Sequence, residues 1–374
     1  MKKSLIALAV LASFAGVASA QSSVTLFGIV DATLAFGHGT ASNKTQLTNS
    51  GYNSSRLGFR GTEDLGGGMS ASFWLEAGVN NDNGTGAATN TNNQTTGGAV
   101  AGIGGGQGLT FNRRSTVSLA GGWGELRLGR DYTPQFWNLT VFDPFGTNGV
   151  GTTQTLNSII TGVTAVRASN SIGYFLPGNL GGFYGQVQYY LGENNSNAVN
   201  VVCTGVNIPA GCGVSTKDDG TGYGLRFGFA NGPFNVALAL SRTKYAAGDV
   251  QQNNVAGQWD FGVAKLMGEY SFDKNEAATS GKGKGYLIGG LIPVGAGEIR
   301  LAYSRYKVEL AAATPTAKKW AIGYDYNLSK RTVLYTTYAH VSNSGGAGQA
   351  LNGATLTSTN DSSTGLDIGI RHAF

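Results

Sequence analysis

Apolar and polar side chains alternate with a period of two through most of the chain. In one segment Phe183, Val187 and Tyr189 share one face. Gln186 and Gln188 share the other face of the same segment. This period indicates an extended strand with one apolar and one polar face. Repeated in segments of about ten residues, it is typical of strands that cross a membrane.

The alternation recurs in sixteen segments. Their first residues are Val24, Ser55, Met69, Thr110, Glu125, Ser169, Phe183, Gly222, Phe234, Val255, Ala264, Gly285, Glu298, Lys319, Thr332 and Thr364. An even number of crossings predicts that both ends of the chain lie on the same side of the membrane.

Short and long connections alternate between these segments. The short ones are rich in Gly, Asn, Asp and Pro, which supply the backbone angles of tight turns. The long ones are polar and cover residues 80–108, 132–167, 192–221 and 342–363. Short turns at one end and long loops at the other are the layout of an outer-membrane barrel.

Periodicity alone also fits a soluble β-sandwich, in which one face of each strand is apolar. The chain, however, ends in Phe374 at the end of an alternating strand, and Tyr and Trp gather near strand ends. Such aromatic girdles are typical of membrane barrels. We therefore predict an all-β fold, a sixteen-stranded antiparallel transmembrane β-barrel, whose closed sheet pairs every backbone group within lipid.

Composition narrows the classes further. The 374 residues include 60 Gly and 7 Pro, and only 13% are charged. After residue 20 no run of about 18 apolar residues occurs, which excludes a helical-bundle membrane protein. The 10% of aromatic residues disfavours a disordered chain.

The first twenty residues have the pattern of an export signal. Lys2 and Lys3 precede an apolar stretch, residues 5–17, that is too short to span a bilayer. The small residues 18–20 then form a cleavage site. We expect residues 1–20 to be removed, leaving a barrel domain at 21–374 in the outer membrane.

Two cysteines, Cys203 and Cys212, lie in a polar stretch of an exported chain. They are expected to form a disulfide within one loop. A metal site would need more ligands than this stretch offers, because the only histidines are His38, His340 and His372. No cofactor is expected.

Several strings resemble the general porins of beta-proteobacteria, and they span the chain from its first strand to its last residue. They are SSVTLFGIVD (22–31), SRLGFRGTEDLGGG (55–68), NRRSTV (112–117), GELRLGRD (124–131) and GIRHAF (369–374). The resemblance implies a homotrimer in outer-membrane lipid, passive diffusion of small hydrophilic solutes and ions, and a third extracellular loop folded into the lumen.

In that family an arginine cluster lines the constriction, and the matching positions here are Arg56, Arg113 and Arg167. Glu76 faces the lumen by its parity and matches an acidic position of the family. Strict alternation places Arg113 outward, so a bulge or the strand's end must redirect it, or Arg114 takes its role.

Two further residues complete the predicted constriction. Arg60 shares the parity of Arg56, and Asp143 in the loop 132–167 is expected to supply a negative wall opposite the arginines. Because arginine stays protonated, the cluster predicts a moderate anion preference. The simpler alternative for Arg60, Arg114, Arg127 and Arg130 is that they pair with lumen carboxylates and hold loops.

Three other functions compete with that of a general porin. A barrel enzyme is disfavoured, because no Gly-x-Ser-x-Gly, Gly-x-Gly-x-x-Gly, phosphate loop or Cys-x-x-Cys occurs. Of the two histidines in predicted strands, His372 faces lipid by its parity, and the register around His340 does not fix its side. A surface adhesin with a plugged lumen and a solute-specific porin remain open alternatives.

Overall fold

The computed structural model describes residues 23–95, 108–153, 162–199, 213–276 and 281–374. The expected leader 1–20 and the cysteine pair Cys203 and Cys212 lie outside these ranges. The elements are β1 (Ser23–Gly39), β2 (Lys44–Asn49), β3 (Arg56–Gly66), β4 (Met69–Asn80), β5 (Thr85–Gly86), β6 (Arg114–Gly121), β7 (Gly124–Tyr132), α2 (Pro134–Phe142), β8 (Arg167–Phe175), β9 (Phe183–Tyr190), β10 (Gly222–Asn231), β11 (Phe234–Thr243), β12 (Val250–Asp260), β13 (Lys265–Asn275), β14 (Gly281–Val294), β15 (Gly297–Glu309), β16 (Thr316–Asn327), β17 (Thr332–Ser344) and β18 (Ser362–Ala373).

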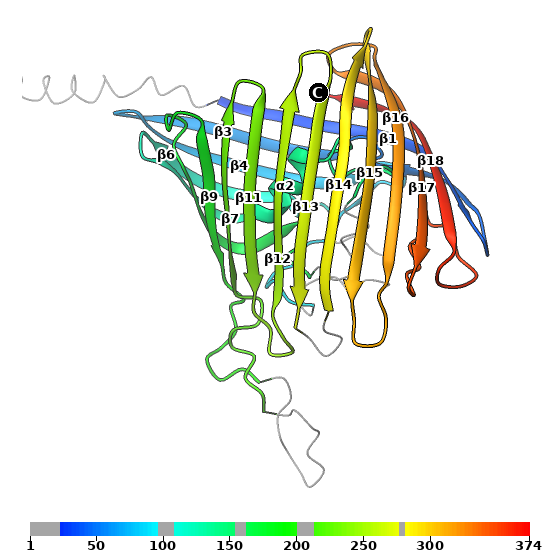
Figure 1. Ribbon diagram of the computed structural model, residues 1–374. Helices are drawn as coiled ribbons and strands as arrows, with labels where there is room; N and C mark the ends of the chain where they lie inside the picture. Colours follow the sequence, from blue (N-terminus) through cyan, green and yellow to red (C-terminus); the bar gives the residue numbers. More distant parts are fainter. Residues whose placement is uncertain (1–22, 96–107, 154–161, 200–212, 277–280) are drawn as a thin grey trace, which may run out of the picture.

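The strands form one closed antiparallel sheet (Figure 1). β1 pairs with β3 along its first half and with β18 along its second half, which joins the two ends of the sheet. Among the described strands, β2 is in register with β1 and β5 with β4, and these two short strands add to a cylinder of sixteen. The predicted count, pairing and closure are confirmed.

Two strands begin four or more residues earlier than the alternation predicted. β12 starts at Val250 rather than Val255, and β14 starts at Gly281 rather than Gly285. In these extensions the outward positions are polar, such as Gln251 and Lys282, so the apolar signal stops before the backbone pairing does. The hydrophobic pattern marks the lipid-facing part of a strand, and the ladder continues beyond it.

The barrel is apolar outside and polar inside. On β1 the outward Val30 and Leu34 are 43% and 42% exposed, whereas the inward Asp31 and Thr33 are fully buried. A soluble protein would bury the first pair and expose the second. Among the described residues, no helix is both long and apolar enough to cross a bilayer.

The last residue helps to close the cylinder. The backbone N–H of Gly28 donates to the carbonyl of Phe374, and the N–H of Phe374 donates to the carbonyl of Gly28, both at 3.1 Å. A Cβ atom at Gly28 would lie 2.3 Å from Cζ of Phe374 and 2.8 Å from the carbonyl oxygen of Arg56. The seam therefore requires glycine at this position.

We expect Gly28→Leu to weaken the seam by about 1–3 kcal/mol, because the new side chain overpacks a paired backbone. The measurement is the temperature at which the folded barrel loses its fast migration on a gel in detergent. Gly122→Leu is the matched control, since a Cβ atom there meets no atom within 4 Å. Equal unfolding temperatures for the two variants would contradict this account of the seam.

Candidate lumen constriction

The segment between β7 and β8 folds into the barrel, as predicted; we call it L3. It begins with Thr133 and Pro134, and a proline in the first turn suits a helix start because its missing N–H leaves no donor unpaired. Figure 1 shows the resulting helix α2 within the outline of the barrel, behind β11–β13. α2 packs against the strands from β9 to β13.

Side-chain amides fasten α2 to that wall. Asn138 donates through Nδ2 to the carbonyl of Ala237 at 3.1 Å and accepts from Nε of Arg226 at 2.5 Å. Asn254 donates to the carbonyl of Gln135 at 3.0 Å. These bonds satisfy buried polar groups on both partners, so the helix has a fixed position.

The second half of L3 is fastened to the wall formed by β16 and β18. The N–H of Val150 donates to Oδ2 of Asp367 at 2.8 Å, and Nζ of Lys319 donates to the carbonyl of Thr152. Phe145 and Val150 join a buried apolar cluster on the inner side of β14–β17. The described parts of L3, residues 133–153 and 162–166, therefore lie along one side of the lumen and leave the other side open.

Asp143 does not form a negative wall, in contrast to the sequence expectation. Its carboxylate is buried and accepts from the N–H of Phe145 at 2.8 Å and from the N–H and Oγ1 of Thr153 at 3.0 and 2.6 Å. Burial raises the pKa of the Asp143 carboxyl, while these bonds and the charge of Lys319 act in the opposite direction. The residue shapes the turn after α2. Its charge does not line the opening.

Glu76 is the centre of the arginine cluster on the side that L3 leaves open. Its Oε1 lies 2.6 Å from Nε of Arg113 and 3.3 Å from Nη1 of Arg56. Its Oε2 accepts from Nε1 of Trp74 at 3.1 Å. One buried carboxylate thus faces two guanidinium groups, so the cluster keeps a net positive charge.

Tyr132, the last residue of β7, links Arg167 to this cluster. Its hydroxyl accepts from Nη2 of Arg113 at 2.8 Å and from Nη2 of Arg167 at 3.0 Å. The guanidinium of Arg167 also lies over the Tyr132 ring, 4.5 Å from its centre, and donates through Nε to the carbonyl of Arg113 at 2.8 Å. The structure therefore brings Arg56, Arg113 and Arg167 together.

Arg113 reaches the lumen because β6 begins one residue later, at Arg114. Outside the paired strand, alternation does not fix the side chain, and the backbone N–H of Arg113 already donates to the carbonyl of Glu76. Of the three expected solutions, the one observed is that the strand's end redirects Arg113. Arg114 faces inward as well, with Thr116 on the same face of β6.

A second charged group lies on the neighbouring part of the same wall. Arg127 contacts Asp131 at 2.6 Å and Glu125 at 2.9 Å, and Arg114 lies 3.8 Å from Asp131. For Arg114 and Arg127 the structure thus shows pairing with lumen carboxylates. Arg130 holds the loop between β4 and β6 through the carbonyls of Asn90 and Asn112.

Arg60 is placed differently from these arginines. It is exposed, and its guanidinium lies 5.3 Å from the ring centre of Phe27 and 5.1 Å from that of Trp74. In the described part of the chain no carboxylate lies within ion-pair distance of Arg60. Aromatic faces attract a cation without neutralising it, so Arg60 keeps its full charge toward the lumen.

The wall formed by β3, β4, β6, β7 and β8 is therefore positive. Six arginines, Arg56, Arg60, Arg113, Arg114, Arg127 and Arg167, face three carboxylates, Glu76, Glu125 and Asp131. L3 carries a single acidic residue in its whole sequence, the buried Asp143. Ions in the opening thus pass between a cationic wall and an uncharged loop surface.

Trp74, Tyr132 and Asp131 belong to this site but were not singled out from the sequence. Trp74 shares the parity of Glu76 on β4, so alternation could have placed it in the lumen. Nothing in the pattern marks Tyr132 as the acceptor of two arginines, because this depends on the bulge in β7 between Gly129 and Asp131.

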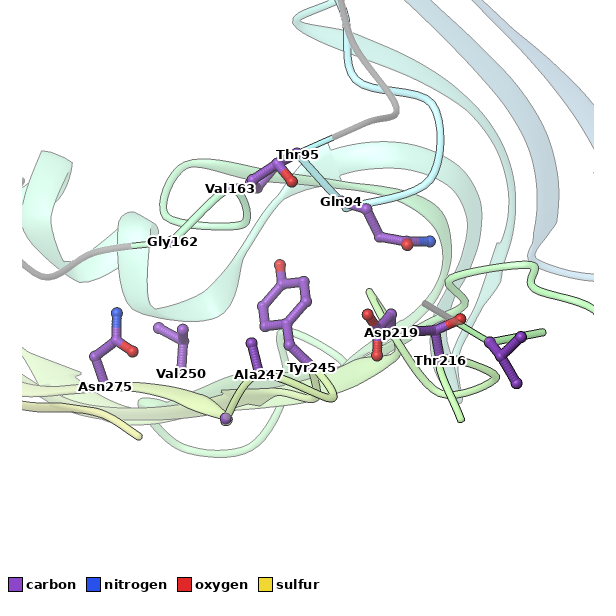
Figure 2. A pocket seen from close by; sticks show the side chains of 12 residues that line it. Gln94, Thr95, Gly162, Val163, Thr216, Asp219, Tyr245, Ala247, Val250 and Asn275 are labelled. Atoms are coloured by element: carbon purple, nitrogen blue, oxygen red, sulfur yellow. The ribbon is translucent and has the colours of Figure 1, made fainter. Parts of the chain in front are cut away.

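A cavity of about 530 Å³ lies among the long loops (Figure 2). Its lining includes Gln94, Val163, Asp219 and Tyr245, and the Tyr245 hydroxyl donates to the carbonyl of Asn93 at 2.7 Å. Four separate connections therefore meet at this cavity. Within the described ranges, no group of three or more His, Cys, Asp or Glu side chains could hold a metal ion.

Comparison with known proteins gives concordant results. Residues 7–346 match the family model described as Gram-negative porin. The chain is 37% identical to outer membrane porin protein 32 of Delftia acidovorans, with both chains covered over their full length. Among solved structures it is similar to an anion-selective porin from Comamonas acidovorans, with a TM-score of 0.78, 34% identity and coverage of 95% of this chain and 100% of that one. OmpT of Vibrio cholerae, in a form lacking loop L8, shares the fold with a TM-score of 0.66 at 13% identity and coverage of 94% and 99%.

Proposed function

The chain belongs to the family of Gram-negative porins, and we propose that its pore favours small anions over cations. It is an outer-membrane protein whose closed barrel provides a passive channel for ions and small hydrophilic solutes. Members of this family are channels rather than enzymes, and we propose no catalytic activity for this one. We further propose that residues 1–20 are removed on export and that Cys203 and Cys212 pair.

The anion preference rests on one observation above all. Arg56 and Arg113 share a single carboxylate, Glu76, and Arg167 joins them through Tyr132, while the opposing loop presents no exposed acid. Two unit charges 4 Å apart interact with an energy of about 4 kcal/mol at the effective dielectric constant near a protein surface. In bulk water the same pair interacts with about 1 kcal/mol. The excess charge therefore attracts anions strongly. The anion selectivity of the similar Comamonas porin supports the proposal.

Carboxylates on the far side of the lumen do not offset this excess. Asp31 accepts from the N–H groups of Tyr52 and Asn53, at 2.8 and 2.6 Å, and from the hydroxyl of Tyr335. Asp325 pairs with Arg300 at 2.9 Å. Arg300 balances the charge of Asp325, whereas Asp31 is fully buried and its oxygens are occupied by loop backbone and by Tyr335.

We expect a reversal potential of anionic sign when the purified protein separates two KCl solutions in a planar bilayer. The permeability ratio of chloride to potassium should exceed one at about 0.1 M salt and approach one at about 1 M, because the Debye length falls from about 10 Å to about 3 Å. Discrete conductance steps would also exclude an adhesin with a plugged lumen. A ratio below one at low salt would overturn the proposed preference.

We propose that the protein works as a homotrimer, as other porins do. A solved structure of OmpT of Vibrio cholerae in its trimer form, which shares this fold, supports the proposal. Native mass spectrometry of the detergent-extracted protein measures the state directly. A species of three chains supports the proposal and a single chain contradicts it.

A further inference from the structure

The outer face of β13–β16 carries a dense group of basic side chains at the end from which the long loops leave. In β14 the chain reads Gly-Lys-Gly-Lys-Gly, so Lys282 and Lys284 point outward while the glycines between them are buried. We call the whole group the outer basic patch. It consists of Lys274, Lys282, Lys284, Arg305, Lys307 and Lys318.

The register of the sheet places like charges opposite each other in three cross-strand pairs, and Lys282 also faces Glu309 on β15. Lys274 is the partner of Lys282, and Lys284 is the partner of Lys307. Arg305 is the partner of Lys318 in the next pair of strands. Side chains directly opposite in an antiparallel pair are about 4.5–5.5 Å apart at Cβ, where like charges destabilise the sheet. A bound anion would offset this repulsion.

The acidic residues of this region are too few to do so. Glu276 contacts Lys274 at 2.5 Å, and Glu309 contacts Lys307 at 3.3 Å and Lys284 at 3.9 Å. In the described part of these strands, two carboxylates thus face six cations on the outer surface. The patch keeps a clear positive excess, directed away from the lumen.

Below the patch the same strands present aromatic rings and then apolar hollows. Tyr286, Tyr303 and Trp320 lie two residues from Lys284, Arg305 and Lys318 on their respective strands. A hollow of about 380 Å³ follows, lined by Ile288, Gly289, Leu301, Ala302, Tyr303, Trp320, Ala321 and Ile322. A neighbouring one of about 360 Å³ is lined by Ile299, Ile322, Gly323, Tyr324, Thr336 and Tyr338.

These layers match the parts of an acidic lipid. Four residues along a strand cover about 13 Å, so the cations stand roughly that far above Ile288, Leu301 and Ile322. Aromatic rings between them lie at the level of headgroups in membrane proteins. A soluble anion would use the cations but not the apolar hollows, whereas a lipid with a phosphorylated headgroup would fill both.

We propose that the outer basic patch binds the phosphate groups of a glycolipid of the outer leaflet, whose acyl chains lie in the hollows below. The inference uses the outward direction of the long loops, which is typical of outer-membrane barrels. It does not depend on the ion preference of the pore, because the patch and the lumen lie on opposite faces of the sheet.

The first experiment compares lipids with the unchanged protein. Purified protein in neutral detergent is titrated with diphosphoryl lipid A, with monophosphoryl lipid A, or with inorganic phosphate, and bound lipid is read by native mass spectrometry. We expect diphosphoryl lipid A to bind most tightly and phosphate alone not to compete at millimolar concentration. Equal binding of the two lipids, or full competition by free phosphate, would overturn the proposal.

The second experiment removes charge from the patch. Lys282→Gln with Lys284→Gln should weaken binding of diphosphoryl lipid A by about tenfold to thirtyfold, given the contribution of a lysine near an anionic lipid surface. The control, Lys330→Gln with Arg331→Gln, removes two exposed positive charges from the turn between β16 and β17 at the opposite rim. Equal loss in both variants would contradict the assigned location, and conductance recorded in parallel shows separately whether the channel is intact.

Discussion

Changing Arg56, Arg113 and Arg167 together to glutamine is expected to turn the pore from anion preference to cation preference. The change leaves three arginines, Arg60, Arg114 and Arg127, against three carboxylates on this wall. It also leaves Glu76, on the wall opposite L3, without either of its ion-pair partners. We expect the chloride-to-potassium permeability ratio at about 0.1 M salt to fall about tenfold, which corresponds to about 1.4 kcal/mol.

A fourth substitution identifies the source of the reversed preference. Adding Glu76→Gln to the triple variant removes the unpaired carboxylate, so the permeability ratio should return to a value near one. Removing one partner of a buried ion pair destabilises by about 3–5 kcal/mol, which makes a folding check necessary for the triple variant. Lys282→Gln, Lys284→Gln and Lys307→Gln together form the matched control, because they remove three charges from the outer face. An unchanged ratio in the folded triple variant would refute the role of the arginines.

Alternation predicted the barrel well because each barrel strand separates lipid from water. A residue such as Asp31 has only two possible directions, and the apolar neighbours Val30 and Ala32 settle which one it takes. The same rule placed the side chains of Glu76 and Arg60 on the lumen face of the sheet, where the structure has them. It fails where a chain leaves the ladder, as at Arg113, and it lost the first residues of β14, where Lys282 replaces the apolar signal.

The course of L3 could not be read from the sequence in the same way. Its anchors join residues far apart in the chain, since Val150 and Asp367 are separated by 217 positions. The sequence shows Asp143 as a loop carboxylate. Only the fold reveals that this carboxylate is buried and accepts hydrogen bonds from Thr153 and Phe145. The charge balance of the opening therefore follows from long-range packing, even though the arginines themselves were identified by the resemblance.

Releasing the part of L3 around Val150 and Thr152 should strongly change how steadily the channel stays open. We expect Lys319→Ala with Asp367→Ala to detach the part of L3 around Val150 and Thr152, because both groups donate to or accept from its backbone. Hydrogen bonds to charged groups contribute about 1.5–3 kcal/mol each, so their loss places this loop in the range where local opening is populated. The detached loop then moves into the side of the lumen that it now leaves free.

The measurement is single-channel current in a planar bilayer. The double variant should show frequent brief closures and a mean conductance about twofold lower, while the ion preference stays the same, because the two substitutions cancel in charge and spare the arginine wall. Asp260→Ala with Lys265→Ala is the control, since it removes another oppositely charged pair, 3.9 Å apart, at the short-turn end. Quiet channels in the Lys319 and Asp367 variant, with an unfolding temperature equal to that of the unchanged protein, would show that the bonds to Val150 and Thr152 do not hold L3 in place.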